Sequence, residues 1–86
     1  MLSTAVDDDQ RVRREAQNRI DGAERLVQGI DRTKLAEQQE QSVQTIESFL
    51  SKAKEALAMR DVQRAYTLAD KAFVLADELS KTLSTR

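Results

Sequence analysis

The chain has 86 residues with neither cysteine nor histidine, and its 14 basic and 15 acidic side chains give a net charge of −1. A single small domain of this size must therefore fold without disulfides and without the commonest metal ligand. The charges are spread evenly along the chain, so no segment has the basic excess that phosphate binding needs, and nucleic acid is not expected as a partner.

Charged residues make up 34% of the chain and aromatic residues 3%, and proline is absent. A composition rich in Ala, Leu, Glu, Gln, Lys and Arg is typical of long helices. The sequence therefore predicts an all-α fold without β-strands, either a three-helix bundle or a helical hairpin with an additional N-terminal helix. We expect helices over about 7–30, 34–59 and 61–83, in a single helical domain 7–86 that follows a disordered lead-in over 1–6.

The first predicted helix starts at the three aspartates 7–9, because carboxylates stabilise the N-terminus of a helix. A calcium loop is the alternative for this run, but it needs spaced ligands and a glycine turn that the run lacks. Apolar residues over 12–30 fall within an arc of about 120° on a helical wheel, which is typical of a helix packed on one side. On the opposite face acids precede bases by four residues, so Glu15 is expected to pair with Arg19.

The segment 28–35, QGIDRTKL, is the predicted break between the first two helices. Gly29 lowers helix stability, and Asp31 and Thr33 are both candidate caps for a new helix. Because one glycine interrupts a helix only weakly, a continuous helix over 7–59 is the alternative.

The second and third helices are predicted to form a hairpin. Apolar residues from Val43 to Leu57 occupy an arc of about 140° on the second helix. Asp61 is the predicted N-cap of the third helix, after a short turn around Arg60. A link this short makes the two helices antiparallel neighbours.

The third helix has alanines at 65, 69, 72 and 76 in the middle of an apolar arc of about 180°, which is wider than one neighbouring helix requires. Small side chains allow close approach of another helix, so this helix is expected at the centre of the fold. It should pack on the second helix and on either the first helix or a second copy of the chain, with Val74 on its polar side. The predicted helix-packing or partner-binding residues are Leu50, Ala53, Leu57, Ala65, Tyr66, Leu68, Ala69, Ala72, Phe73, Leu75, Ala76 and Leu79.

Residues 53–79, AKEALAMRDVQRAYTLADKAFVLADEL, resemble the helical hairpin of tetratricopeptide-like repeats. They are more similar still to the alanine-rich hairpins of small bacterial envelope proteins and lipoproteins of uncharacterised role. Arg60 stands where glycine is usual in the tetratricopeptide turn. The resemblance implies an interaction or assembly module at the cell envelope, and it implies no catalytic residue.

The residue inventory does not favour an enzyme. The chain has no histidine or cysteine to act as base or nucleophile and no glycine-rich phosphate loop. The carboxylates of Glu37 and Glu40 lie on one face of a glutamine-rich helix, where such a pair is ordinarily solvated. We therefore expect no catalytic site, no cofactor, no bound metal and no small-molecule ligand.

Three functional hypotheses follow. The leading one is a non-catalytic helical protein–protein interaction or assembly module whose partner is itself, as an antiparallel homodimer, or another helical protein. The alternative is a structural helical fragment of a larger bacterial envelope protein. A third, a membrane-surface helix in the first segment, is weakened by the many acids on its polar face. Membrane insertion is not expected because apolar runs are short, and without an evident targeting segment the cytoplasm and the bacterial envelope both fit.

Overall fold

The computed structural model describes residues 3–84, with side chains from residue 8 onward. In chain order it contains α1 (Ser3–Gln28), a short 3₁₀ turn η1 (Arg32–Lys34), α2 (Glu37–Ala58) and α3 (Val62–Ser84). These elements confirm the predicted all-α three-helix fold, and no strand occurs within the described residues.

Some predicted boundaries need correction. The helix α1 begins at Ser3, so residues 3–6 of the expected lead-in form its first turn, whereas residues 1 and 2 of that lead-in lie outside the described part. The helix α2 begins at Glu37, three residues after its predicted start at position 34. The alternative of one continuous helix over 7–59 is wrong, because the chain leaves the helical path between Gln28 and Glu37.

Polar side chains organise the link between α1 and α2. The carboxylate of Asp31 accepts hydrogen bonds from the backbone N–H of Thr33 at 3.1 Å and from its hydroxyl at 2.6 Å. These bonds lower the pKa of Asp31, with the hydroxyl as the largest cause. Asp31 therefore caps η1 rather than α2, and Thr33 caps neither element. At the start of α2 the side-chain oxygen of Gln39 accepts from the N–H of Ala36 at 2.9 Å, which satisfies one backbone donor there.

The turn between α2 and α3 is a Schellman motif followed by a cap. Arg60 has a φ of 63°, the left-handed conformation that usually selects glycine. Its N–H donates to the carbonyl of Leu57 at 3.0 Å, and the N–H of Asp61 donates to the carbonyl of Ala56 at 2.9 Å. The Asp61 carboxylate then accepts a long hydrogen bond of 3.4 Å from the N–H of Arg64, as expected of the predicted N-cap.

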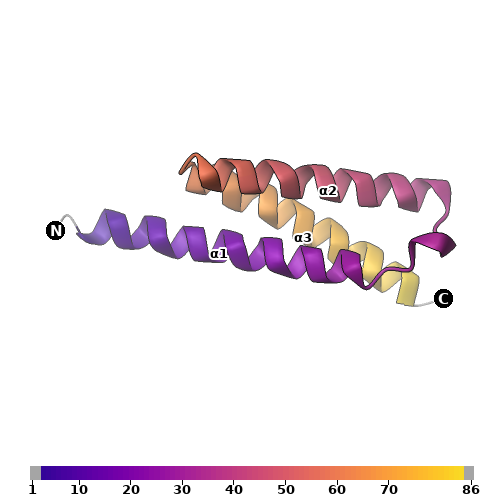
Figure 1. Cartoon of the computed structure of the whole chain (residues 1–86). Helices are drawn as coiled ribbons and strands as arrows, with labels where there is room; N and C mark the ends of the chain where they lie inside the picture. Colours follow the sequence, from indigo (N-terminus) through magenta and orange to yellow (C-terminus); the bar gives the residue numbers. More distant parts are fainter. Residues whose placement is uncertain (1–2, 85–86) are drawn as a thin grey trace.

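The helix α3 is the central element of the bundle, as its wide apolar arc predicted. It packs extensively on both α1 and α2, whereas α1 and α2 touch each other far less. Figure 1 shows α3 running obliquely between the other two helices, from the end of α2 toward the end of α1. The second neighbour that its apolar arc required is therefore α1 of the same chain.

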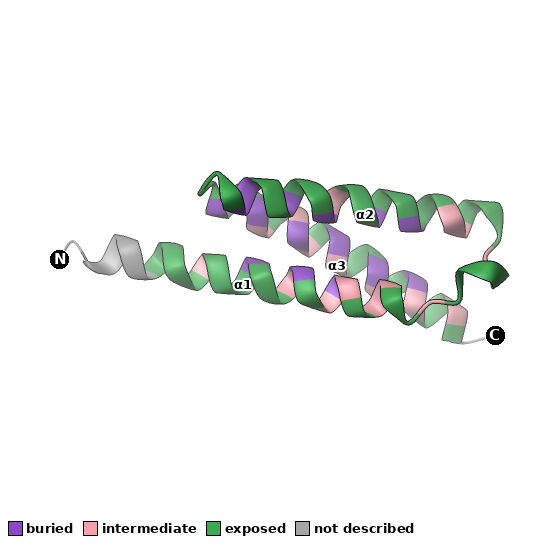
Figure 2. Ribbon diagram, in the orientation of Figure 1, coloured by how far each residue is buried: buried purple, intermediate pink, exposed green. Residues whose placement is uncertain are grey.

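The core is built mainly from alanine and branched aliphatic side chains. Figure 2 shows that buried positions recur along α2 and α3 while the outer faces of the helices are exposed. The buried cluster consists of Ala16, Ile20, Ala23, Val43, Ile46, Leu50, Ala53, Ala56, Leu57, Ala65, Ala69, Ala72, Ala76 and Leu79. With alanine at so many contacts, the helices lie close together and the core is thin.

The bundle is elongated. Its Cα atoms extend over 52 × 21 × 14 Å, and the radius of gyration is 14.6 Å, compared with about 12 Å for a typical compact domain of this length. The first turns of α1 extend past the turn between α2 and α3 (Figure 1). Near that point the Arg13 guanidinium donates a hydrogen bond to the carbonyl of Leu57 at 3.0 Å. A side chain of α1 therefore supplies a hydrogen-bond donor to one of the last carbonyl groups of α2, which lack donors within their own helix.

Candidate functional site

The structure separates the twelve predicted packing residues into three groups. Those that are buried are Leu50, Ala53, Leu57, Ala65, Ala69, Ala72, Ala76 and Leu79. Tyr66, Leu68 and Phe73 are partly buried. Leu75 is 36% exposed and lies outside the core. Most of the predicted set is therefore internal packing, and Leu75 is the member that points to an external surface.

The aromatic edge of α3 packs against α1 around Arg19. The Arg19 guanidinium lies 5.8 Å from the Tyr66 ring centre and 5.7 Å from the Phe73 ring centre, which is within the range of cation–π attraction. Its Nε donates to the Asp70 carboxylate at 3.2 Å. That hydrogen bond, together with nearby Tyr66, raises the pKa of Arg19. Arg19 pairs across to α3 instead of with Glu15, so the pairing predicted within α1 is wrong.

Gly22 explains how the Phe73 ring reaches α1. A Cβ atom at position 22 would lie only 2.9 Å from Cε1 of Phe73, closer than carbon atoms normally approach. Glycine in the middle of a helix lowers its stability by about 1 kcal/mol, and here the missing side chain makes room for the ring. The aromatic edge is consequently covered by α1.

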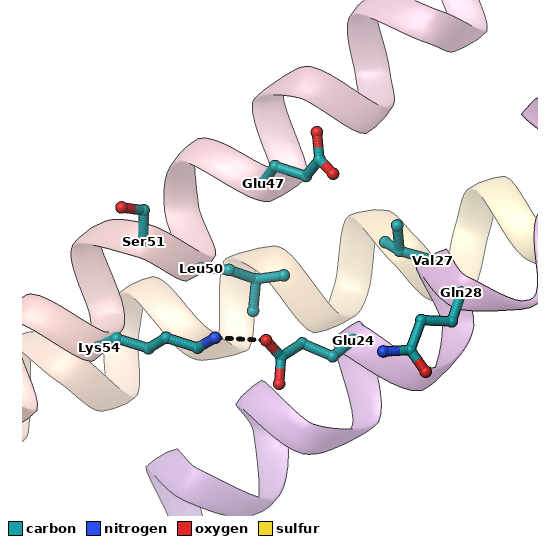
Figure 3. Close-up of a pocket in the computed structure, with 7 residues that line it drawn as sticks. All are labelled: Glu24, Val27, Gln28, Glu47, Leu50, Ser51 and Lys54. Carbon is teal, nitrogen blue, oxygen red and sulfur yellow. Dashed lines mark hydrogen bonds and ion pairs between the residues drawn. The ribbon is translucent and has the colours of Figure 1, made fainter.

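A shallow groove runs between α1 and α2, the two helices of the bundle that contact each other least. It has a volume of about 330 Å³, and its lining residues are Glu24, Val27, Gln28, Glu47, Leu50, Ser51 and Lys54. Figure 3 shows the side chains of Glu24 and Lys54 pointing toward one another across it, joined by an ion pair. Arg32 pairs with Glu40 and, at 3.2 Å, with Glu47 near one end. The charges of the groove are therefore largely matched within the chain.

A second surface lies on the outer side of the hairpin formed by α2 and α3. We define the hairpin patch as Phe49 of α2 with Val74 and Leu75 of α3. Val74 is 44% exposed, Leu75 is 36% exposed, and Phe49 is partly buried. These three residues line an open depression of about 380 Å³ together with Asp70 and Lys71. The hairpin patch is thus a contiguous apolar surface that neither α1 nor another segment of the described chain covers.

Lys71 lies at the edge of the hairpin patch. Its ammonium is 6.0 Å from the centre of the Phe49 ring, so its side chain borders the aromatic surface. Val74 was predicted on the polar side of α3, and its exposure agrees with that prediction. The sequence pattern did not reveal that Val74 and Leu75 meet Phe49, because that contact depends on how α2 lies against α3.

Met59 provides a contrast with the hairpin patch. It is 75% exposed, more than any other large apolar residue described, and it lies at the turn between α2 and α3. The depression beside it, of about 520 Å³, is lined mainly by charged side chains, among them Lys52, Glu55 and Arg64. Met59 is therefore an isolated apolar side chain, whereas Val74 and Leu75 belong to a continuous surface.

Among the described residues, no cluster of His, Cys, Asp or Glu has an arrangement that could hold a metal ion. No described helix combines the length and the apolar character needed to cross a bilayer. No family model, curated protein or solved structure was found to match this chain.

Proposed function

We propose that this chain is a non-catalytic helical protein–protein interaction module that binds its partner through the hairpin patch. One observation carries the proposal. Val74 and Leu75 are exposed on the outer side of the hairpin, and together with Phe49 they form an apolar surface that no other described helix covers. Contiguous exposed apolar area bordered by charges is typical of a surface that binds another protein.

The shape of the hairpin patch favours a helical partner. It lies over the joint between α2 and α3, so it presents an open depression bordered by both helices. A helix laid along such a depression buries its own apolar stripe against α2 and α3 at once. The groove between α1 and α2 is a weaker candidate, because Glu24 and Lys54 are paired with each other across it.

Photo-crosslinking tests the proposal for any partner. Benzoylphenylalanine is placed at Leu75, or at Met59 as the matched control, in cells that produce the chain. We expect crosslinked species of defined mass from position 75 and only background from position 59. Since Met59 is the more exposed of the two, non-specific collisions would favour the control.

A second variant strengthens this experiment. Val74→Lys places a charge inside the hairpin patch and should remove the crosslink at position 75 without unfolding the chain, because Val74 is already 44% exposed. Equal crosslinking at positions 59 and 75, or a crosslink that survives Val74→Lys, would mean that the hairpin patch is not a binding surface.

A further inference from the structure

The charges and apolar side chains on the exposed face of α3 are arranged symmetrically. Val74 and Leu75 are adjacent at its centre, Lys71 precedes Val74 by three residues, and Glu78 follows Leu75 by three. All four side chains are exposed. Residues three or four apart on a helix lie on neighbouring turns of the same surface. The apolar pair is therefore flanked by a positive side chain on its N-terminal side and by a negative side chain on its C-terminal side.

Lys71 and Glu78 form no ion pair with another described residue, whereas Asp77 of the same helix pairs with Lys81 at 2.9 Å. That hydrogen-bonded pair is the main cause of the raised pKa of Lys81, and Glu78 makes the smallest contribution to it. The two charged positions that border the apolar pair are therefore available to an external partner.

Two-fold symmetry decides which partner satisfies this arrangement. In an antiparallel pair of α3 helices with the axis between positions 74 and 75, Val74 meets Leu75 of the second copy. The same axis places Lys71 beside Glu78 of the second copy, and symmetry repeats this pair on the other side. A parallel pair in register would instead bring the two copies of Lys71 together, and likewise the two copies of Glu78, which is unfavourable.

We propose that the partner of the hairpin patch is a second copy of this chain, packed with α3 antiparallel to α3 and held in register by two Lys71–Glu78 pairs. This inference rests on the proposed function, because it identifies the partner of the same surface. Phe49 borders the contact from α2, and its ring centre lies 6.0 Å from the Lys71 ammonium.

The dimer is expected to be weak, because the apolar centre is small and its charge pairs stay partly solvated. A dissociation constant on the order of 10–100 μM is typical of such small interfaces. Sedimentation analysis must therefore extend from low micromolar to millimolar chain concentration, with helicity followed by circular dichroism to show that every variant is folded.

Charge reversal and mixing test the register. Lys71→Glu places a carboxylate beside Glu78 of the second copy twice per dimer, and Glu78→Lys creates two ammonium pairs in the same way. Each variant should raise the dissociation constant at least about tenfold. When the two variants are mixed, both charge contacts of a heterodimer join a carboxylate to an ammonium group, so mixing should restore association.

The double variant Lys71→Glu/Glu78→Lys is the decisive arm of this experiment. It exchanges the two charges, so both contacts of its antiparallel homodimer again join opposite charges. We expect it to dimerise with nearly the wild-type dissociation constant. It should also fail to form heterodimers with the wild-type chain, because every contact between the two would then join like charges, and native mass spectrometry of the mixture measures this.

The outcomes separate the two proposals. Recovery in the double variant, together with its exclusion of the wild-type chain, supports the antiparallel register. Wild-type dimers that are insensitive to both single reversals, or a chain of monomer mass at millimolar concentration, would overturn this inference. In either case a crosslink at position 75 that Val74→Lys removes would still support the proposed function, with a different partner or register.

Discussion

The two interfaces of α3 have different chemistry. Toward α2 no ion pair of the described residues joins the two helices, and the Lys71 ammonium lies 6.0 Å from the centre of the Phe49 ring. Toward α1 it presents Tyr66 and Phe73, whose rings both lie near Arg19, with the Arg19–Asp70 pair beside them. The first interface has no ion pair among the described residues, whereas the second combines apolar contact with an ion pair and two aromatic rings around Arg19.

The difference follows the connectivity of the chain. The link between α2 and α3 occupies only residues 59–61, so a regular apolar pattern on each helix is enough to pair them. Arg19 and Asp70 are 51 residues apart, and α1 is connected through the longer segment 29–36. A helix held by such distant contacts has more possible positions, and directional interactions with Arg19 and close contact at Gly22 limit them.

The largest effect on the free energy of unfolding is expected when one isoleucine from each interface is truncated. Ile20 of α1 and Ile46 of α2 are both completely buried. Truncating either to alanine should lower the free energy of unfolding by about 2–4 kcal/mol, because each leaves a cavity in the thin core. Chemical denaturation followed by circular dichroism measures both, and a single shared transition is expected if α1 and the hairpin unfold together.

One result with this pair of variants would contradict the expectation of a single shared unfolding transition. If Ile20→Ala produces a separate early transition while the rest of the chain melts as before, α1 is an independently docked helix rather than part of one cooperative unit. Val74→Lys is the matched surface control and should change the free energy of unfolding by less than about 0.5 kcal/mol.

A smaller effect distinguishes the two glycines. Gly22→Ala should lower the free energy of unfolding by about 1 kcal/mol, because displacing the Phe73 ring outweighs the gain in helix propensity. Gly29→Ala should raise it by about 0.5–1 kcal/mol, since its new Cβ would lie 3.6 Å from its nearest neighbours and the glycine has no positive φ. Thermal denaturation of both variants gives the comparison.

The Phe73→Ala background tests the reason for this difference. Once the ring is removed, Gly22→Ala should stabilise the chain by about 1 kcal/mol through helix propensity. If Gly22→Ala is equally unfavourable with and without the ring, close packing between α1 and α3 at this point does not explain the glycine.

The smallest expected effect belongs to the turn of the hairpin. Arg60→Gly should raise the free energy of unfolding by roughly 0.5–1 kcal/mol, because glycine adopts the φ of 63° without steric cost. Met59→Gly is the control, since Met59 has a φ of −90° and glycine should there be destabilising. Equal melting temperatures for the two variants would mean that strain at Arg60 does not limit the stability of the hairpin.

Several local features were predictable because they depend on neighbouring residues. The periodicity of apolar residues predicted the three helices, and the wide arc of α3 predicted its central position, as the structure confirms. Asp61 was correctly predicted as the cap of α3, because its carboxylate acts on a backbone group three residues away. The start of α2 was misplaced, because the carboxylate of Asp31 caps a 3₁₀ turn instead.

Other features depended on contacts between distant segments. The partner of Arg19 was predicted wrongly because Glu15 satisfies the spacing rule within α1, and the sequence has no signal for the competing carboxylate of Asp70. The role of Gly22 likewise depends on a ring from another helix. Of the predicted packing residues, the pattern did not separate Leu75 from Leu79, although the first is 36% exposed and the second 8%.

By itself, the sequence determined that this chain forms helices, where α2 turns back into α3, and which stripe of each helix is apolar, because these properties follow from local backbone chemistry and side-chain periodicity. Only the tertiary structure decided that α1 covers the aromatic edge of α3 and leaves Val74 and Leu75 uncovered beside Phe49. The physical reason is that an apolar arc specifies how much surface a helix must bury, whereas the angle and register of its neighbours decide which residues they cover.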